Sequence, residues 1–215
     1  MKSVFCSALA IALPVTMLAG GSTGFDDQEI GGAPAGWTVA MTGKGSPQWT
    51  VENEAKAPSG DKVLKQSGTA SYPLCVKDDT SLTDGFVEVY FKPLTGKKDQ
   101  AAGIVWRYRD PNNYYIVRAN ALEDNVVLYK VEKGKRSSLN IVGRKEGYGV
   151  DAEVPNGQWQ VLRVEIAGDL FTVSLEGKEL FQVKDQTFAG AGKVGLWTKA
   201  DSVTLFDDFS YGAKD

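Results

Sequence analysis

Cationic and amide side chains recur at alternate positions along residues 84–133, where they could bind a ligand. Alternation with a period of two is typical of a β-strand that has one buried face and one polar face. If consecutive strands of this segment pair as an antiparallel meander, their polar side chains share one face of the sheet. That face would carry Tyr90, Lys92, Arg107, Arg109, Arg118, Asn120 and Lys130. Its cations and amides would hydrogen-bond hydroxyls, and an arginine fork would match a carboxylate.

The C-terminal part of the chain adds Trp197, Lys199 and Asp201 to this candidate ligand site. Trp197 precedes a polar loop, so we expect its ring to be available for stacking, whereas Trp106 alternates in phase with Tyr108 and is predicted to lie in the core. The alternative to a ligand site is an ordinary solvated outer face, on which cations also guard against aggregation.

The chain contains no histidine, which excludes several kinds of catalysis. Ser-His-Asp and Cys-His mechanisms, His-ligated zinc and imidazole acid-base chemistry all require it. Carboxylates, cations, amides, hydroxyls and aromatic rings remain. Cys75 lies in the apolar run 72–76, so we expect a buried, inert thiol.

The elements that position these residues are predicted to be strands throughout. Four consecutive strands with short turns fill residues 84–133, one turn being Asp110-Pro111-Asn112-Asn113. Further strands are predicted at 37–40, 49–52, 62–65, 159–166, 170–175, 180–183, 194–199 and 203–209. Many short strands separated by turn signals indicate an all-β, two-sheet antiparallel sandwich or jelly roll.

The N-terminus has the pattern of a secretory signal peptide, with Lys2, the apolar run 4–18 and small residues at 19–22. We expect residues 1–22 to be removed, leaving residues 23–215 as one periplasmic or extracellular domain. The apolar run is shorter than the ~20 residues that span a bilayer, so we expect no membrane span after cleavage. An uncleaved anchor is the alternative. The net charge of −3 argues against a nucleic-acid partner, and we expect a monomer.

Four stretches of the sequence carry a family resemblance: 103–108 (GIVWRY), 113–120 (NYYIVRAN), 192–198 (GKVGLWT) and 206–209 (FDDF). They resemble concanavalin A-like lectin and glucanase jelly rolls, and within that superfamily the secreted bacterial 3-keto-disaccharide hydrolase-like domains. The resemblance covers residues 37–211. It implies a sandwich whose concave sheet binds sugars, but one jelly roll hosts both lectins and hydrolases.

The resemblance does not supply a catalytic motif. Family-16 glucanase relatives carry Glu-x-Asp-x-x-Glu, and no glutamate of this chain begins Glu-x-Asp. Glycoside hydrolysis needs two carboxyl groups about 5–10 Å apart. Candidates for such a pair are Glu88, Asp110, Glu123, Asp124, Glu132, Glu165 and Asp201. Asp207 and Asp208 could cap a loop or bind calcium, but no Asp-x-Asp-x-Asp-Gly loop is present. We expect no cofactor and no dedicated metal site, with calcium as the open alternative.

Three functional hypotheses follow. The first is a secreted carbohydrate-interacting protein that binds a glycan on the concave sheet through Arg107, Arg118, Asn120, Lys130 and Trp197. The second is a glycoside hydrolase or lyase acting on 3-keto or related disaccharides, where a base abstracts a proton made acidic by a neighbouring ketone and a cation stabilises the enolate. The third is a non-catalytic structural envelope protein.

Overall fold

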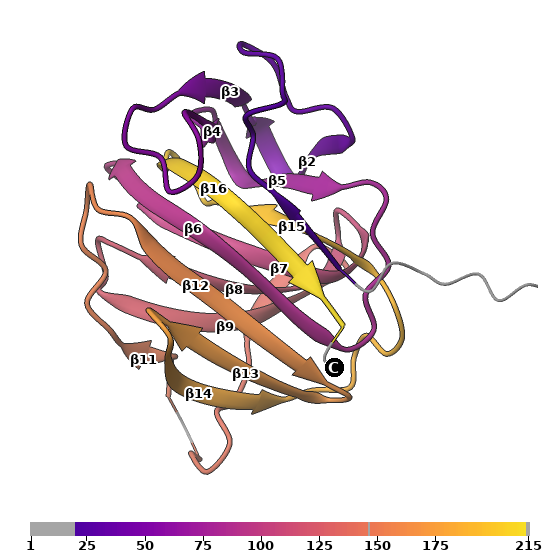
Figure 1. Ribbon diagram of the computed structural model, residues 1–215. Helices are drawn as coiled ribbons and strands as arrows, with labels where there is room; N and C mark the ends of the chain where they lie inside the picture. The colour runs from indigo at the N-terminus through magenta and orange to yellow at the C-terminus, as the bar shows by residue number, and fades with distance from the viewer. Residues whose placement is uncertain (1–19, 146, 214–215) are drawn as a thin grey trace, which may run out of the picture.

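Alternating apolar side chains give strands that bury one face, and the computed structural model arranges them as two antiparallel sheets over residues 20–145 and 147–213 (Figure 1). Sheet A contains, in spatial order, β14 (Lys178–Lys184), β13 (Leu170–Leu175), β12 (Gln160–Ala167), β6 (Gly85–Thr95), β16 (Val203–Gly212), β4 (Lys62–Gln66) and β3 (Trp49–Asn53), with β1 (Gly20–Thr23) beside β16. Sheet B contains β10 (Lys135–Ser138), β9 (Asn125–Glu132), β8 (Asn113–Asn120), β7 (Ala101–Asp110), β15 (Lys193–Trp197), β5 (Thr69–Lys77) and β2 (Trp37–Ser46), with β11 (Val150–Asp151) beside β9.

The predicted all-β sandwich is confirmed, but the predicted four-strand meander is wrong in one strand. Strands β7, β8 and β9 form a meander in sheet B, whereas β6 pairs with β12 and β16 in sheet A. The connection from β6 to β7 therefore crosses between the sheets. Period-two alternation identified β6 as a strand with one buried face, but it carries no information about which sheet the strand joins.

Two apolar clusters hold the sandwich together. The first fills the space between the sheets and includes Val89 and Phe91 of β6, Trp106 of β7 and Phe206 of β16. Trp106 is fully buried, as predicted. The second cluster covers the opposite, outer face of sheet B and includes Leu74, Val105, Ile116 and Trp197, among others. Because β8 is buried on both faces, its sequence is a nearly continuous apolar run.

Sheet B curls strongly, so its edges approach each other across its outer face. Arg136 of edge strand β10 lies with its guanidinium carbon 5.0 Å from the ring of Tyr72, which belongs to β5, although four strands separate β10 from β5 in the sheet. The curl explains how Trp197 and Tyr114, which belong to the outer-face cluster, are fully buried. The concave surface of this sheet is thus largely filled by the protein's own side chains.

An irregularity at Arg107 reverses the facing of β7. Arg107 has φ of +47°, and the pairing of β7 with β8 shifts register between Trp106 and Asp110. Trp106 consequently packs between the sheets, whereas Tyr108 packs against the outer-face cluster. The sequence pattern had placed these two rings on the same side, because strict alternation does not anticipate a bulge.

The N-terminal strand overlaps the predicted end of the signal peptide. Residues Gly20 to Thr23 form β1 and pair with β16 from Gly212 to Phe209. The predicted charged and apolar parts of the signal peptide lie outside the described residues, and cleavage after residue 22 stays a prediction. In the described part of the chain, no helix has the length and apolar character needed to cross a membrane.

The thiol of Cys75 is buried, as expected. Burial, reinforced by the nearby carboxylate of Asp78, raises the pKa of Cys75 well above its usual range. Because the thiolate is the reactive species, we expect no measurable reaction of the native protein with a disulfide reagent at mildly alkaline pH. Unfolding in urea should release one reactive thiol per chain after signal removal. Rapid labelling of the native protein would contradict this account.

Candidate functional site

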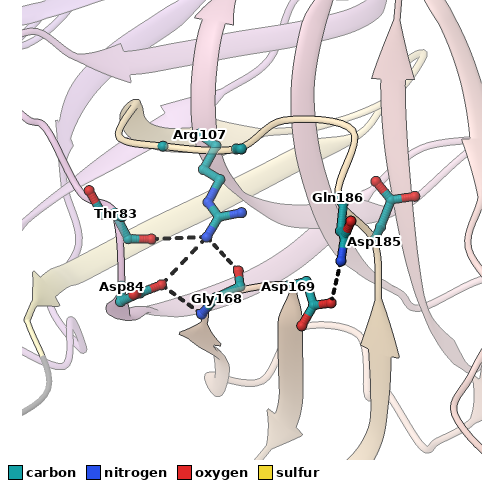
Figure 2. A pocket seen from close by; sticks show the side chains of 9 residues that line it. Thr83, Asp84, Arg107, Gly168, Asp169, Asp185 and Gln186 are labelled. Atoms are coloured by element: carbon teal, nitrogen blue, oxygen red, sulfur yellow. Dashed lines mark hydrogen bonds and ion pairs between the residues drawn. The ribbon is translucent and has the colours of Figure 1, made fainter.

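A hollow opens at one end of the sandwich, where four neighbouring strands of sheet A begin or end. Because β14, β13, β12 and β6 pair antiparallel, the last residues of β12 and β14 lie at the same end of the sandwich as the first residues of β6 and β13. The residues just outside these strands therefore meet there. The hollow, called the end pocket below, has a volume of about 400 Å³ and is lined by Thr83, Asp84, Arg107, Gly168, Asp169, Asp185, Gln186, Ala189 and Gly190 (Figure 2).

Arg107 is the organising cation of the end pocket. Its Nη2 donates to the carbonyl of Gly168 at 2.6 Å and to that of Thr83 at 3.2 Å, while Nη1 donates to the carbonyl of Phe188 at 3.0 Å. Nη2 also lies 3.5 Å from Oδ1 of Asp84. Figure 2 shows the guanidinium pointing towards Thr83, Asp84 and Gly168. The side chain is only 5% exposed, so one buried cation joins three separate segments of the pocket wall.

Carboxylates supply most of the remaining polar groups. Asp84 accepts a hydrogen bond from the backbone of Gly168 at 2.8 Å, and Asp169 accepts one from Gln186 at 2.9 Å. Asp185 accepts from the hydroxyl of Tyr115 at 2.6 Å. Each carboxylate keeps oxygen lone pairs that these bonds do not use, because an ionised carboxylate has about four acceptor sites.

Asp185 is held as an anion. Partial burial raises the pKa of its carboxyl group, but hydrogen bonds from Thr187, Tyr115 and Lys130 outweigh burial and hold the pKa below its usual range. The ammonium group of Lys130 lies 3.2 Å from Oδ2. Asp185 is therefore an ionised acceptor at neutral pH and is poorly suited to donate a proton.

The charges of the end pocket are nearly balanced. Arg107 offsets Asp84, and Lys130 offsets Asp185, which leaves Asp169 as the surplus anion. A pocket of this kind favours neutral groups that donate hydrogen bonds, above all hydroxyls, over an anionic ligand.

The sequence-predicted site residues fall into separate places rather than on one face. Arg107 lies in the end pocket, and Lys130 lies behind it, on the inner side of sheet B. Tyr90 belongs to β6 of sheet A, opposite Asp207 of β16. The prediction of one shared polar face is therefore wrong, because β6 joins the other sheet and Lys130 shares the facing of Tyr115, its partner in the ladder.

Four predicted residues lie towards the opposite side of sheet B. Asn120 donates to Asp99 at 2.7 Å, and Lys199 forms an ion pair with the same carboxylate. Arg118 is fully buried, and its Nη2 donates to Glu123 at 2.7 Å. Trp197, expected to be exposed, is completely buried. A ligand-binding role for each of these residues stays a prediction.

Asp201 holds a turn in place. It accepts hydrogen bonds from the backbone N–H groups of Lys97 at 2.9 Å, Lys98 at 3.0 Å and Asp99 at 3.2 Å. Slight burial raises the pKa of Asp201, but these backbone bonds prevail and lower it. These observations favour a structural role.

We expect Asp201→Ala to lower the free energy of unfolding by about 1 kcal/mol at neutral pH, after allowance for solvent screening. Because the folded-state pKa is lowered, this contribution is present above the unfolded pKa of about 3.9 and is lost as pH falls through the folded value. Urea unfolding of both proteins at neutral pH and at about pH 3 tests this. A stability difference between the wild type and Asp201→Ala that is larger at about pH 3 than at neutral pH would contradict this role of Asp201.

Asp207 caps a loop, one of the two roles predicted for it. Its carboxylate accepts from the backbone of Ser59 at 2.7 Å, from the Ser59 hydroxyl and from the backbone of Asp208. Among the described residues, no group of three or more acidic, cysteine or histidine side chains is arranged to hold a metal ion.

Sequence reasoning missed Asp84, Asp169, Asp185 and Gln186, the polar residues of the end pocket. Each lies in a turn or next to a strand end, and polar residues are common at such positions whether or not they bind a ligand. The sequence does contain a usable signal. If β6, β12, β13 and β14 are assumed to be neighbours in one sheet, all four residues must lie at the same end of these strands. The strand order was the missing information.

Comparison with known proteins places this architecture among the concanavalin A-like and galectin-like jelly rolls. The carbohydrate-binding module CBM66 from Bacillus subtilis superposes with a TM-score of 0.65 at 19% identity, covering 83% of this chain and 96% of its own. Cellulose-induced protein Cip1 gives 0.62 at 14% identity, covering 90% and 97%. A lichenase from a mouse hindgut metagenome gives 0.57 at 10% identity, covering 91% and 99%. At these identities the likeness concerns the fold alone.

The family is defined by sequence. Residues 25–210 match the model of the 3-keto-alpha-glucoside-1,2-lyase-like domain, and the chain belongs to this family. The family resemblance read from the sequence is thus confirmed. No curated protein is similar enough in sequence to count as a relative.

Proposed function

We propose that this protein binds a neutral carbohydrate, and that the end pocket receives one of its sugar rings. The observation that carries the proposal is the end pocket itself, a hollow of about 400 Å³ in which three carboxylates, Gln186 and a buried arginine converge. Pockets that recognise small molecules combine a concave shape with a few well-placed polar groups. Sugar hydroxyls would donate to the carboxylate oxygens and accept from the Gln186 amide.

The end pocket is favoured over the concave sheet predicted from the sequence. The side chains of Asp84 and Gln186 are exposed in the end pocket, whereas much of the outer face of sheet B is occupied by buried rings such as Trp197 and Tyr114. Membership of a carbohydrate-related family, and a fold shared with carbohydrate-binding modules and glycoside hydrolases, support a saccharide as the ligand. Secretion to the periplasm or beyond is part of the same proposal.

Calorimetric titration with trehalose and sucrose, both α-glucosides, and with their 3-keto derivatives tests this proposal. Asp169→Asn keeps the shape of the side chain but removes the surplus anion, and we expect it to weaken binding about tenfold or more through the loss of charge-assisted hydrogen bonds. Asp151→Asn is the matched control, because Asp151 is exposed on β11 of the other sheet. Equal affinities of the two variants would argue against the end pocket.

A second candidate function is elimination on a 3-keto-α-glucoside, which the family description and the three pocket carboxylates favour. A carboxylate would take the proton from C2, the electron pair would form the C1–C2 double bond, and the aglycone would leave from C1 with a proton. The lowered pKa of Asp185 makes it a weak base, and this favours binding over elimination.

The elimination product is a conjugated enone that absorbs in the near ultraviolet, so turnover can be followed directly. If the protein only binds, we expect it to bind the keto sugar with no increase in near-ultraviolet absorbance over time. A rise that depends on enzyme concentration and disappears in Asp169→Asn or Asp84→Asn would establish the lyase instead.

A further inference from the structure

Arg136 lies on the outer face of sheet B, and no residue that the structure describes accepts a hydrogen bond from its guanidinium. The guanidinium carbon lies 4.3 Å from the ring of Tyr129, 5.0 Å from that of Tyr72 and 5.7 Å from that of Trp197. Nη1 is buried without a hydrogen-bond partner. The side chain as a whole is only partly buried, so part of it reaches solvent.

Other buried or half-buried arginines of the described chain have acceptors. Arg107 donates to three carbonyls, Arg118 pairs with Glu123, and Arg163 pairs with Glu88. Aromatic rings attract a cation electrostatically but accept few of the five N–H donors that lie in the guanidinium plane. The protein therefore fixes the position of Arg136 and leaves its hydrogen-bonding capacity unused.

Two further cations lie on this side of sheet B, and each is paired with a carboxylate. Arg118 also lies against Tyr129, with its guanidinium carbon 5.9 Å from that ring, and is paired with Glu123. Burial raises the pKa of Glu123, but Arg118 and, to a smaller extent, Lys199 lower it below its usual range; Lys199 itself is paired with Asp99. Each of these two cations has its own carboxylate, so Arg136 is the surplus charge among the residues that the structure describes here. The excess is local, because the chain as a whole carries −3.

The half-exposed ring of Tyr148 lies on the same outer face of sheet B. Tyr148 is 50% exposed, and its ring lies edge-on to that of Tyr129, with the two centroids 5.9 Å apart. Its hydroxyl accepts a hydrogen bond from Arg118 at 3.2 Å. Tyr148 and Arg136 both contact the ring of Tyr129, so this face offers an apolar contact and a fork for an anion on either side of one residue.

We propose that the outer face of sheet B carries a second ligand site, which takes the carboxylate or sulfate of an acidic saccharide on Arg136 with Tyr148 beside the sugar. The anionic part rests on the contacts of Arg136, and the saccharide part rests on the proposed function. This site differs in charge from the end pocket, where Asp169 is the surplus ion. The two sites therefore select different groups.

The test uses tetragalacturonate, its methyl ester and a sulfated galactan tetrasaccharide as calorimetric probes of the full-length mature protein. The methyl ester keeps the sugar and removes the charge. We expect the acid to bind at least about tenfold more tightly than the ester, with added salt weakening only the acid. The sulfated probe distinguishes a sulfate from a carboxylate as the preferred anion, and binding of either acidic probe supports the site.

Two substitutions locate the binding. Arg136→Met keeps an apolar stem against the rings and should abolish the preference for the acid, while Arg136→Lys should restore part of it. Lys135→Met is the control, because Lys135 is exposed on the same strand and should leave affinity unchanged. Trehalose titrations of the same variants report on the end pocket separately. Equal binding of acid and ester, no binding of either acidic probe, or an unchanged preference in Arg136→Met would overturn the proposal, whatever trehalose does.

Discussion

Replacing Arg107 with methionine is expected to lower the free energy of unfolding by about 3 kcal/mol or more. The substitution removes a buried cation, and the loss of its hydrogen bonds leaves several buried acceptors unpaired. The carbonyls of Thr83, Gly168 and Phe188 would all lose their donor. Asp84 would lose its ion pair but is 54% exposed, so water can solvate it. Urea unfolding followed by tryptophan fluorescence measures the change.

Arg109→Met is the matched control for this substitution. Arg109 lies on the same strand, is exposed, and donates one hydrogen bond, to the carbonyl of Ala189 at 2.8 Å. Its removal should cost less than about 1 kcal/mol. If the two variants unfold at the same urea concentration, Arg107 does not hold the end pocket together in the way its contacts indicate.

Trp197→Ala is expected to have an effect of similar size, about 3–5 kcal/mol, because deletion of a fully buried indole leaves a large cavity. The ring of Trp197 stacks on Tyr72 with centroids 5.5 Å apart and planes 24° apart, and it is entirely shielded from solvent. The ligand-stacking role suggested by the sequence pattern stays a prediction, while the burial and stacking of this ring favour a role in packing. Thermal and urea unfolding should both report the loss.

Two other substitutions separate packing from ligand contact at this face. Trp197→Phe should recover much of the stability, since it retains an aromatic ring in the same space. Tyr148→Ala should change stability by less than about 0.5 kcal/mol, because its ring is half exposed. A stable Trp197→Ala protein with impaired saccharide binding would reverse the assignment and return Trp197 to the ligand site.

Most strands were predictable because burial of one face of a strand makes apolar and polar residues alternate in the sequence. The alternation of Val87, Val89 and Phe91 correctly marked β6, and all three side chains are buried between the sheets. The partner of a strand leaves no such trace. That is why β6 was assigned to the wrong sheet, and why the polar face built on Tyr90 does not exist as predicted.

The candidate site was less predictable than the fold for two physical reasons. Residues of the end pocket such as Asp84 and Asp185 are 101 positions apart in sequence and meet only through strand order. Local geometry also intervenes: the positive φ of Arg107 turns its side chain towards the end pocket, and the curl of sheet B buries Arg118 and Trp197. Neither effect has a simple signature in residue type or spacing.

Amide chemical-shift mapping by NMR during titration with trehalose, sucrose and their 3-keto derivatives tests the carbohydrate site in the end pocket most directly. We expect concentration-dependent shifts centred on Asp84, Gly168, Asp169 and Gln186, with the amides around Tyr148 unaffected. The absence of shifts with every sugar, or shifts confined to the outer face of sheet B, would contradict a carbohydrate site in the end pocket.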